Sequence, residues 1–155
     1  EDKGFISLME ELPRERLALA VNAVAAIRGM LDITSNYAQE REAFGKPISQ
    51  FQHLRFKFAE METKYRLNSA FIKECLNLFQ TNSLDTGTAS MAKLASTEAQ
   101  CEIADTCLQM FGGYGYMKEY PISRAFADAR IQKIYGGTSE IMLELISRDS
   151  FSNKS

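Results

Sequence analysis

Histidine, proline, glycine and tryptophan are scarce in this sequence. Its 155 residues include one histidine, three prolines, nine glycines and no tryptophan. Because His53 is the sole histidine, a site built from paired histidines is excluded, as is a di-iron site made of Glu-x-x-His pairs. We therefore expect no metal site and interpret His53 as a structural or surface residue. The few turn-forming residues indicate a small number of long secondary-structure elements.

An excess of charge of one sign, a disulfide pattern and a long apolar run are also missing. Lys and Arg number 18 against 20 Asp and Glu, so nothing in the charge favours nucleic acid or an anionic membrane as a partner. The three cysteines fit no disulfide or zinc framework, and we expect free thiols in an intracellular compartment. The longest nearly apolar run, Leu17 to Ile27, is too short to span a bilayer. The chain opens with Glu1 rather than methionine, and we expect it to be a piece of a longer protein.

Apolar residues make up 45% of the chain and recur at spacings of three and four, which predicts helices that bury a core. No useful alternating pattern predicts strands. The punctuation by proline and glycine predicts three long helices and two shorter ones. Their expected ranges are Pro13 to about Arg41, Ser49 to about Phe79, Asp85 or Thr86 to Gly112, Glu119 to Gln132, and Thr138 to Arg148.

Local signals set several of these boundaries. Pro13 is typical of the first position of a helix, and Ser49-Gln50-Phe51-Gln52 is a capping box in which Gln52 reaches back to the cap. Long helices need partners, so the expected fold class is all-α, an antiparallel up-and-down four-helix bundle of three long helices plus shorter C-terminal helices. We expect the bundle to occupy residues 1–150 and residues 151–155 to form a frayed tail.

Two glycine-containing segments do not have the spacing of nucleotide-binding loops. Gly112-Gly113-Tyr114-Gly115 lacks the Gly-x-Gly-x-x-Gly pattern and follows no strand. Gly45-Lys46 has no upstream glycine and no hydroxyl residue after the lysine, so it is not a phosphate-binding loop of the P-loop type.

Three other segments carry a specific resemblance. Arg41-Glu42-Ala43-Phe44-Gly45-Lys46-Pro47-Ile48 links the first two long helices; Gln109-Met110-Phe111-Gly112-Gly113-Tyr114-Gly115-Tyr116 is followed by Glu119, Arg124 and Asp128; and Ile134-Tyr135-Gly136-Gly137-Thr138-Ser139-Glu140 precedes the last helix. In this order they resemble the C-terminal helical domain of the flavin-dependent acyl-CoA dehydrogenases, from about Gly4 to Asp149.

The resemblance implies a set of FAD contacts. Arg41 and Gln52 occupy positions that contact the FAD of a neighbouring subunit, and Gln109, Met110, Phe111, Gly112 and Gly113 occupy the stretch whose backbone approaches the adenosine of the same flavin. Thr138, Ser139 and Glu140 match residues that touch the subunit's own FAD. Each position also has a local explanation: a cation at a helix C-terminus for Arg41, a capping box for Gln52, a C-cap and turn for Gly112, and an N-cap for Thr138.

The catalytic base is displaced relative to most of the family. The usual Tyr-Glu-Gly-Thr segment reads Tyr135-Gly136-Gly137-Thr138, so a glycine stands at the base position. The long-chain and isovaleryl subclasses, which also lack that glutamate, supply a base from a Glu-Arg-Leu segment of the first helix, and this chain has Glu15-Arg16-Leu17 there. The resemblance therefore implies Glu15 as the base, with Arg16, Tyr135 and Gly136 on the substrate side. A helix-start acid, a surface arginine and plain aromatic packing are the local alternatives for Glu15, Arg16 and Tyr135.

The implied function is α,β-dehydrogenation of acyl-CoA thioesters, with Glu15 removing the α-proton and flavin N5 accepting the β-hydride. The implied partners are the acyl-CoA substrate, an electron-transfer flavoprotein and further copies of the chain in a homodimer or homotetramer. The expected location is the mitochondrial matrix of a eukaryote or the cytoplasm of a bacterium. The fragment alone is expected to be inactive. Two alternatives remain open: a non-catalytic helical oligomerisation or partner-binding domain, and a relative of the acyl-CoA oxidases.

Overall fold

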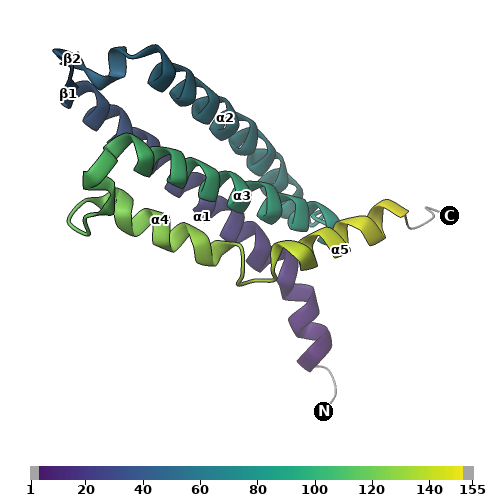
Figure 1. Ribbon diagram of the computed structural model, residues 1–155. Coiled ribbons are helices and arrows are strands. Elements are labelled where there is room, and N and C mark those ends of the chain that lie inside the picture. Colours follow the sequence, from purple (N-terminus) through teal and green to yellow (C-terminus); the bar gives the residue numbers. More distant parts are fainter. Residues whose placement is uncertain (1–3, 152–155) are drawn as a thin grey trace.

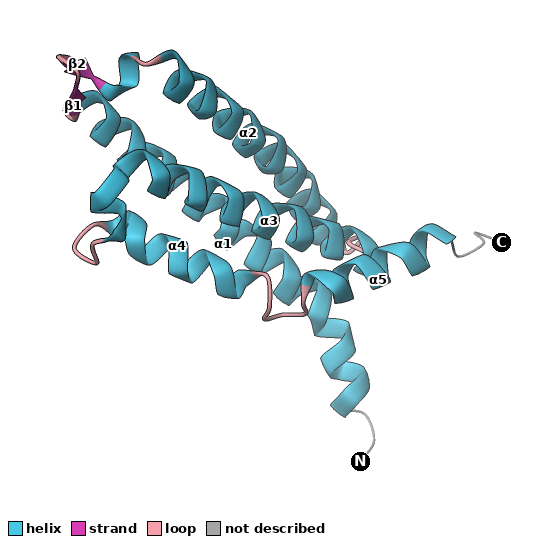
Figure 2. Cartoon of the chain, in the orientation of Figure 1, coloured by secondary structure: helices cyan, strands magenta, loops and turns pink. Residues whose placement is uncertain are grey.

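The computed structural model describes the backbone of residues 4–151 and the side chains of residues 11–149 and of Phe151 (Figure 1). Helices dominate this part of the chain, and the only strands in it, two residues each, form one short hairpin (Figure 2). The elements are α1 (Gly4–Glu40), β1 (Glu42–Ala43), β2 (Lys46–Pro47), the 3-10 helix η1 (Ile48–Gln50), α2 (Gln52–Gln80), α3 (Thr86–Phe111), the 3-10 helix η2 (Gly112–Tyr116), α4 (Pro121–Gln132) and α5 (Ser139–Phe151). The predicted all-α bundle is confirmed.

Helix α3 is the centre of the bundle. It packs against α1, α2, α4 and α5, and more than half of its residues are buried. Small residues such as Ala89, Ala92 and Ala104 let the surrounding helices approach, since all three are fully buried. Larger side chains fill the remaining space, among them Ile27 and Leu31 from α1, which are also inaccessible to solvent. Burial on every side explains why α3 carries so little amphipathic pattern.

Helix α1 begins earlier than predicted. Pro13 lies inside the helix, which starts at Gly4, so proline does not mark its first turn here. The intervening residues Leu8 to Leu12 are strong helix formers that extend the helix upstream of the proline. The segment Glu11–Glu40 is long and apolar enough, by composition, to cross a membrane, unlike the shorter run considered above. Its buried residues belong to the bundle core.

The predicted capping box is wrong. Ser49 lies in η1, Gln52 is the first residue of α2, and the N-cap position belongs to Phe51, which makes no side-chain cap bond. Pro47 is the N-cap residue of the short 3-10 helix η1, and the buried Ile48 is its first residue. The hairpin before it was not predicted. Its turn places Phe44 and Gly45 at φ 52° and 79°, a pair of positive values that suits tight two-residue hairpins.

The boundaries of the later helices agree well with the pattern. Asp85 caps α3 by accepting a hydrogen bond from the Thr88 amide at 2.7 Å, and Gly112 ends it at φ 59°. Thr138 precedes α5, and its hydroxyl accepts a 3.4 Å bond from the amide of Ile141. Helix α5 ends at Phe151, and the rest of the expected tail lies outside the described residues.

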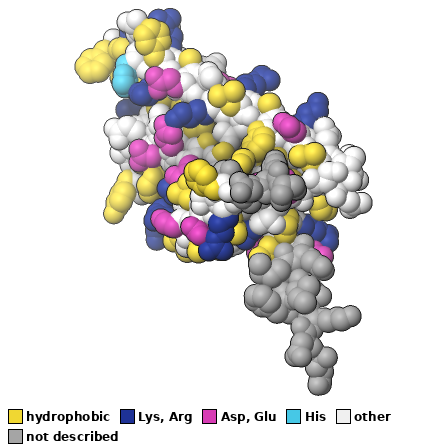
Figure 3. Space-filling model, turned by 90° about the vertical axis from the view of Figure 1, so that its right-hand side faces the viewer, with side chains coloured by type: hydrophobic (Ala, Val, Ile, Leu, Met, Phe, Trp, Pro, Cys, Tyr) yellow, Lys and Arg dark blue, Asp and Glu magenta, His cyan; other side chains and the backbone are white. Residues whose placement is uncertain are grey.

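Positive and negative side chains are interspersed on the face shown in Figure 3, as the balanced composition leads one to expect. The single histidine, His53, is exposed there.

Candidate functional site

The expected site residues fall into three groups on the bundle. One lies where the C-terminal end of α1 meets the end of α3, the second lies around the start of α5, and the third lies between the N-terminal half of α1 and the loop that joins α4 to α5. Glu15 and Arg41 stand 26 residues apart on or just beyond α1, a span of about 39 Å at the rise of an α-helix. Residues of the first and third groups therefore cannot meet within one copy of the chain.

The first group surrounds an open hollow of about 550 Å³. Arg41 leaves the end of α1, and its backbone is fixed by bonds to Tyr37 O and from the amide of Ile48, both 2.8 Å long. Its exposed guanidinium lies 5.6 Å from the centre of the Tyr114 ring, in a cation–π contact. The other lining residues are Gln109, Met110, Phe111, Gly112, Gly113 and Met117.

The end of α3 presents backbone to this hollow. A Cβ added to Gly112 or Gly113 would meet nothing within 4 Å, so both glycines face open space. The side chains of Met110 and Phe111 are instead buried at 7% and 5% exposure, and Phe111 stacks on Tyr37 with ring centres 4.1 Å apart. A ligand in this hollow would meet backbone at these positions. Gln52 does not line it.

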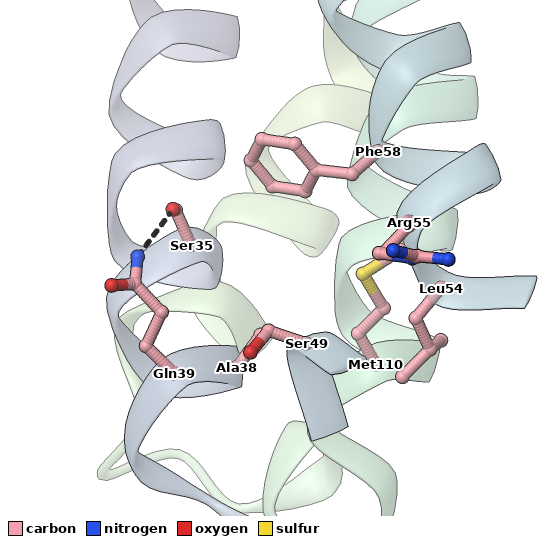
Figure 4. A pocket seen from close by; sticks show the side chains of 8 residues that line it. All are labelled: Ser35, Ala38, Gln39, Ser49, Leu54, Arg55, Phe58 and Met110. Atoms are coloured by element: carbon pink, nitrogen blue, oxygen red, sulfur yellow. Dashed lines mark hydrogen bonds between the residues drawn. The ribbon is translucent and has the colours of Figure 1, made fainter. Parts of the chain in front are cut away.

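A second, more enclosed hollow of about 210 Å³ lies beside the first, between α1, η1, α2 and α3 (Figure 4). Phe58 projects its ring into this space, and the Gln39 amide donates a 3.1 Å hydrogen bond to Ser35 across one wall. Among the expected site residues, Met110 alone lines it, so this hollow was not predicted.

The second group forms a polar corner at the start of α5. The carboxylate of Glu98 on α3 accepts from Ser139 Oγ at 2.7 Å and from Lys133 Nζ at 2.5 Å. Burial raises the pKa of Glu98, but these partners outweigh burial and the net shift is downward. The backbone amide of Glu140, together with the Thr138 hydroxyl, lowers the pKa of the Glu140 carboxyl. Thr138, Ser139 and Glu140 line a hollow of about 180 Å³ together with Lys133 and Arg130.

The third group brings together the two candidate base positions. A Cβ built on Gly136 would lie 3.9 Å from Glu15 Oε1, although the residues are far apart in sequence. Gly136 has φ 65° and Gly137 has φ 100°, values that favour glycine at both positions. Glu15 is exposed in this chain, and Tyr135 is 40% exposed.

Arg16 is not a surface arginine, so that alternative is wrong. Its side chain is buried, with 5% exposure, and Nη1 lies 3.5 Å from Ser90 Oγ on α3. Burial lowers the pKa of Arg16, while the adjacent Glu15 opposes that shift. Its Nε has no hydrogen-bond partner among the described residues. The helical pattern alone could have indicated burial, because Arg16 lies one turn before the buried Ala20.

Two residues of this region were missed by the sequence interpretation. Lys93 on α3 is completely buried and donates a 2.7 Å hydrogen bond to the carbonyl of Gly137. Glu98, five residues later on the same helix, holds the start of α5. A lysine among the small apolar residues of α3 was the available signal, since ammonium groups are seldom fully buried.

Comparison with known proteins identifies the family to which the chain belongs. The family model described as "Acyl-CoA dehydrogenase, C-terminal domain" matches residues 2–151. The long-chain specific acyl-CoA dehydrogenase of mouse mitochondria is 49% identical over 99% of this chain, and the chain spans 36% of that protein's length. An acyl-CoA dehydrogenase from Geobacillus kaustophilus superposes with a TM-score of 0.95 at 39% identity, covering 97% of this chain and 40% of that one.

A glutaryl-CoA dehydrogenase from Mycobacterium smegmatis, solved in complex with FADH2, superposes with a TM-score of 0.88 at 26% identity. The match covers 93% of this chain and 37% of that structure. In sequence and in fold the similarity extends over nearly the whole chain, and it falls on one helical portion of each longer relative. The chain belongs to the acyl-CoA dehydrogenase family, within which it corresponds to the C-terminal helical domain.

Proposed function

We propose that this chain is the C-terminal domain of an FAD-dependent acyl-CoA dehydrogenase in which Glu15 is the catalytic base. The observation that carries the proposal is the meeting of Glu15 with Gly136, where a side chain on residue 136 would start 3.9 Å from the Glu15 carboxylate. The base that is missing at Gly136 is thereby replaced by Glu15, which reaches the same space from α1.

The chain's residues fit a dinucleotide cofactor. Arg41 offers a permanently charged, bidentate fork suited to a pyrophosphate, and it lies beside the open backbone of Gly112 and Gly113. The start of α5 offers a positive dipole end around Thr138, with Lys133 and Arg130 nearby. These two groups line separate hollows of one chain, at the end of α3 and at the start of α5. We propose that each FAD is held by Arg41, Gln52 and Gln109–Gly113 of one subunit and by Thr138, Ser139 and Glu140 of another.

The reaction we propose removes two hydrogens from an acyl-CoA thioester. When bound, the flavin supplies the acceptor for the hydride that leaves the β-carbon. Glu15 takes the α-proton, so that the electrons of the α C–H bond form the new double bond. Gly136 leaves room for the substrate because it has no side chain, Tyr135 borders the acyl chain, and the buried Arg16 places a positive charge beside the base. An electron-transfer flavoprotein is the proposed oxidant that then accepts the electrons.

Glu15→Gln in the full-length protein tests the assignment. The amide keeps the size of the side chain but cannot take a proton, so anaerobic flavin reduction by the best acyl-CoA should be abolished while FAD stays bound. Reduction at the wild-type rate would falsify the role of Glu15. A wild-type protein whose flavin no acyl-CoA reduces would support the non-catalytic alternative. Stoichiometric peroxide formation in air would instead indicate an oxidase.

We also propose that the chain self-associates through the outer face of α2. Phe56 and Leu67 are 58% and 67% exposed, and they share one helix face with Ala59 and Thr63 at spacings of three and four. Exposed apolar side chains gathered in this way are typical of an interface. The isolated domain should sediment as a helical oligomer that retains little FAD, and Leu67→Glu should shift it toward monomer. A strict monomer before mutation, or a fragment with stoichiometric flavin, would contradict this proposal.

In a eukaryotic cell we expect the protein to lie in the mitochondrial matrix, in line with the name of the mouse relative.

A further inference from the structure

We propose that Lys93 is a positioning residue of the acyl pocket, because it holds the Gly136–Gly137 turn opposite the carboxylate of Glu15. The inference deepens the proposed function and rests on it, since the position of the turn matters for catalysis only if Glu15 is the base. Its foundation is the 2.7 Å hydrogen bond from Lys93 Nζ to the Gly137 carbonyl, which joins α3 to the loop between α4 and α5.

The burial of Lys93 calls for a reason beyond packing. It has no exposed surface, and removing an ammonium from water is unfavourable unless the charge is well partnered. The surroundings only partly compensate. Burial lowers the pKa of Lys93, Glu98 raises it through charge, and Arg16 lowers it further. An apolar residue of similar length could fill the same space, and such replacements often leave stability unchanged.

The two glycines of the turn have no side chains that could hold it in place. Gly136 and Gly137 adopt φ values of 65° and 100°. The ends of the loop are attached to α3, because Glu98 accepts from Lys133 at one end and from Ser139 at the other. Between these ends, Lys93 attaches the turn itself to α3, at the residue immediately after Gly136.

The same part of α3 also contacts the segment that carries the base. Ser90 lies three residues before Lys93, and its hydroxyl lies 3.5 Å from Nη1 of Arg16, the residue next to Glu15. Residues three apart lie on the same face of a helix. One face of α3 therefore contacts both walls of the pocket, α1 through Arg16 and the turn through Gly137. The separation between Glu15 and Gly136 is set through this shared support.

Substitution of Lys93 in the full-length, FAD-loaded protein tests the proposal. Lys93→Met keeps an unbranched side chain but ends one atom earlier and removes the donor, whereas Lys93→Gln, of the same reach as Met, keeps a neutral donor. Lys64→Met is the matched control, because Lys64 also ties another element to α3 by pairing with Glu102, away from the turn. The measurements are FAD content, the rate of anaerobic flavin reduction at saturating acyl-CoA, and the acyl-CoA concentration giving half that rate.

We expect Lys93→Met to slow flavin reduction about tenfold to a hundredfold, since a misplacement of about an ångström has effects of that size. The acyl-CoA concentration that gives half the maximal rate should stay within about threefold of the wild-type value. The substitution leaves unchanged the contacts that bind the substrate equally well in the ground state and in the transition state. The rate of flavin reduction in Lys93→Gln should lie between those of Lys93→Met and wild type, and the rate in Lys64→Met should match that of wild type. A Lys93→Met protein at half the wild-type rate or faster would overturn the proposal, as would a failure of both Lys93 variants to fold with FAD bound.

Hydrogen exchange separates this proposal from the assignment of Glu15. Amides of residues 134–140 should exchange faster in Lys93→Met than in wild type or Lys64→Met, whatever the reaction. If Glu15→Gln proves fully active while the turn exchanges faster in Lys93→Met, the proposed base fails but the attachment by Lys93 stands. Unchanged exchange in Lys93→Met overturns the attachment itself.

Discussion

If the two base positions serve one α-carbon, the carboxylate should be movable. We consider Glu15→Gly combined with Gly136→Glu, which takes the base from α1 and places it on the loop before α5. The Cβ of residue 136 would lie 3.9 Å from the present position of Glu15 Oε1, so a glutamate there can direct its carboxylate into the same space. Glu15→Gly alone should lack flavin reduction, and the double variant should recover part of it.

Two obstacles set the size of the recovery. Residue 136 has φ 65°, where a residue other than glycine costs about 1–3 kcal/mol. The new Cβ would also lie 2.4 Å from Leu19 Cδ1, the flexible end of a partly buried side chain, so Leu19 must rotate or be shortened. We expect Gly136→Glu to reduce the free energy of unfolding by about 1–3 kcal/mol. Adding Leu19→Ala should restore flavin reduction further by removing the contact.

The assay is anaerobic flavin reduction in the full-length protein with a series of acyl-CoA chain lengths. A carboxylate displaced by about an ångström should leave the double variant within roughly a hundredfold of wild type. Its preferred chain length should change, because a side chain leaves one wall of the pocket and enters another. Glu15→Gly with Gly136→Gln is the matched control, equal in size but unable to accept a proton. If the glutamate and glutamine versions reduce flavin equally slowly with FAD and fold retained, positions 15 and 136 do not share a target atom.

Two further predictions concern the cofactor and the thiols. Arg41→Ala should lower the FAD content of the purified full-length protein at least several-fold, measured as flavin absorbance per protein. The thermal midpoint of the apoprotein should stay close to that of wild type, because the guanidinium is exposed and the substitution removes its contact with Tyr114. Undiminished FAD content would refute a cofactor role. Burial raises the pKa of Cys107 to about 11, so at pH 8 about one thiol in a thousand is ionised. Maleimide or iodoacetamide should therefore modify Cys107 far more slowly in the folded protein than in urea, as measured by peptide mass spectrometry. Equal rates of modification in the two states would contradict the burial of Cys107.

The sequence predicted the helices well where a local signal also agrees with the packing. The start of α3 near Asp85 or Thr86 and its glycine ending at Gly112 are such cases, and both are confirmed. Pro13 and the Ser49–Gln52 box failed because their signals are permissive. Proline is favoured in a first turn but also occurs inside helices, at the cost of one backbone hydrogen bond, and a capping box needs the chain to enter the helix at that residue. Here Ile48 is buried first, which delays the start of α2 to Gln52.

Candidate site residues could be predicted where a short segment of sequence contains the whole motif. Arg41 and Gly112 border one hollow in the structure, as expected for residues that serve one ligand, although their FAD contacts stay a prediction. The partners of Lys93 and Arg16 could not be predicted in this way, although the helical pattern places both residues at core positions. Their partners depend on which segments face each other across α3, and no local pattern contains that information. A basic residue at a core position indicates only that some partner exists.

The geometry also explains why a base at one position excludes a base at the other. A glutamate on residue 136 would meet Leu19 and would start 3.9 Å from the Glu15 carboxylate. Two carboxylates in that space could not both be ionised without strong repulsion, and the protonated member would be unable to accept a proton from the substrate. The presence of Glu15 therefore favours the smallest residue at position 136. That residue in turn permits the positive φ of the turn, which directs the Gly137 carbonyl to Lys93 on α3. The proposed base Glu15, the two glycines and the buried lysine would thus form one interdependent arrangement, in which a change at any of the three alters what the other two can do.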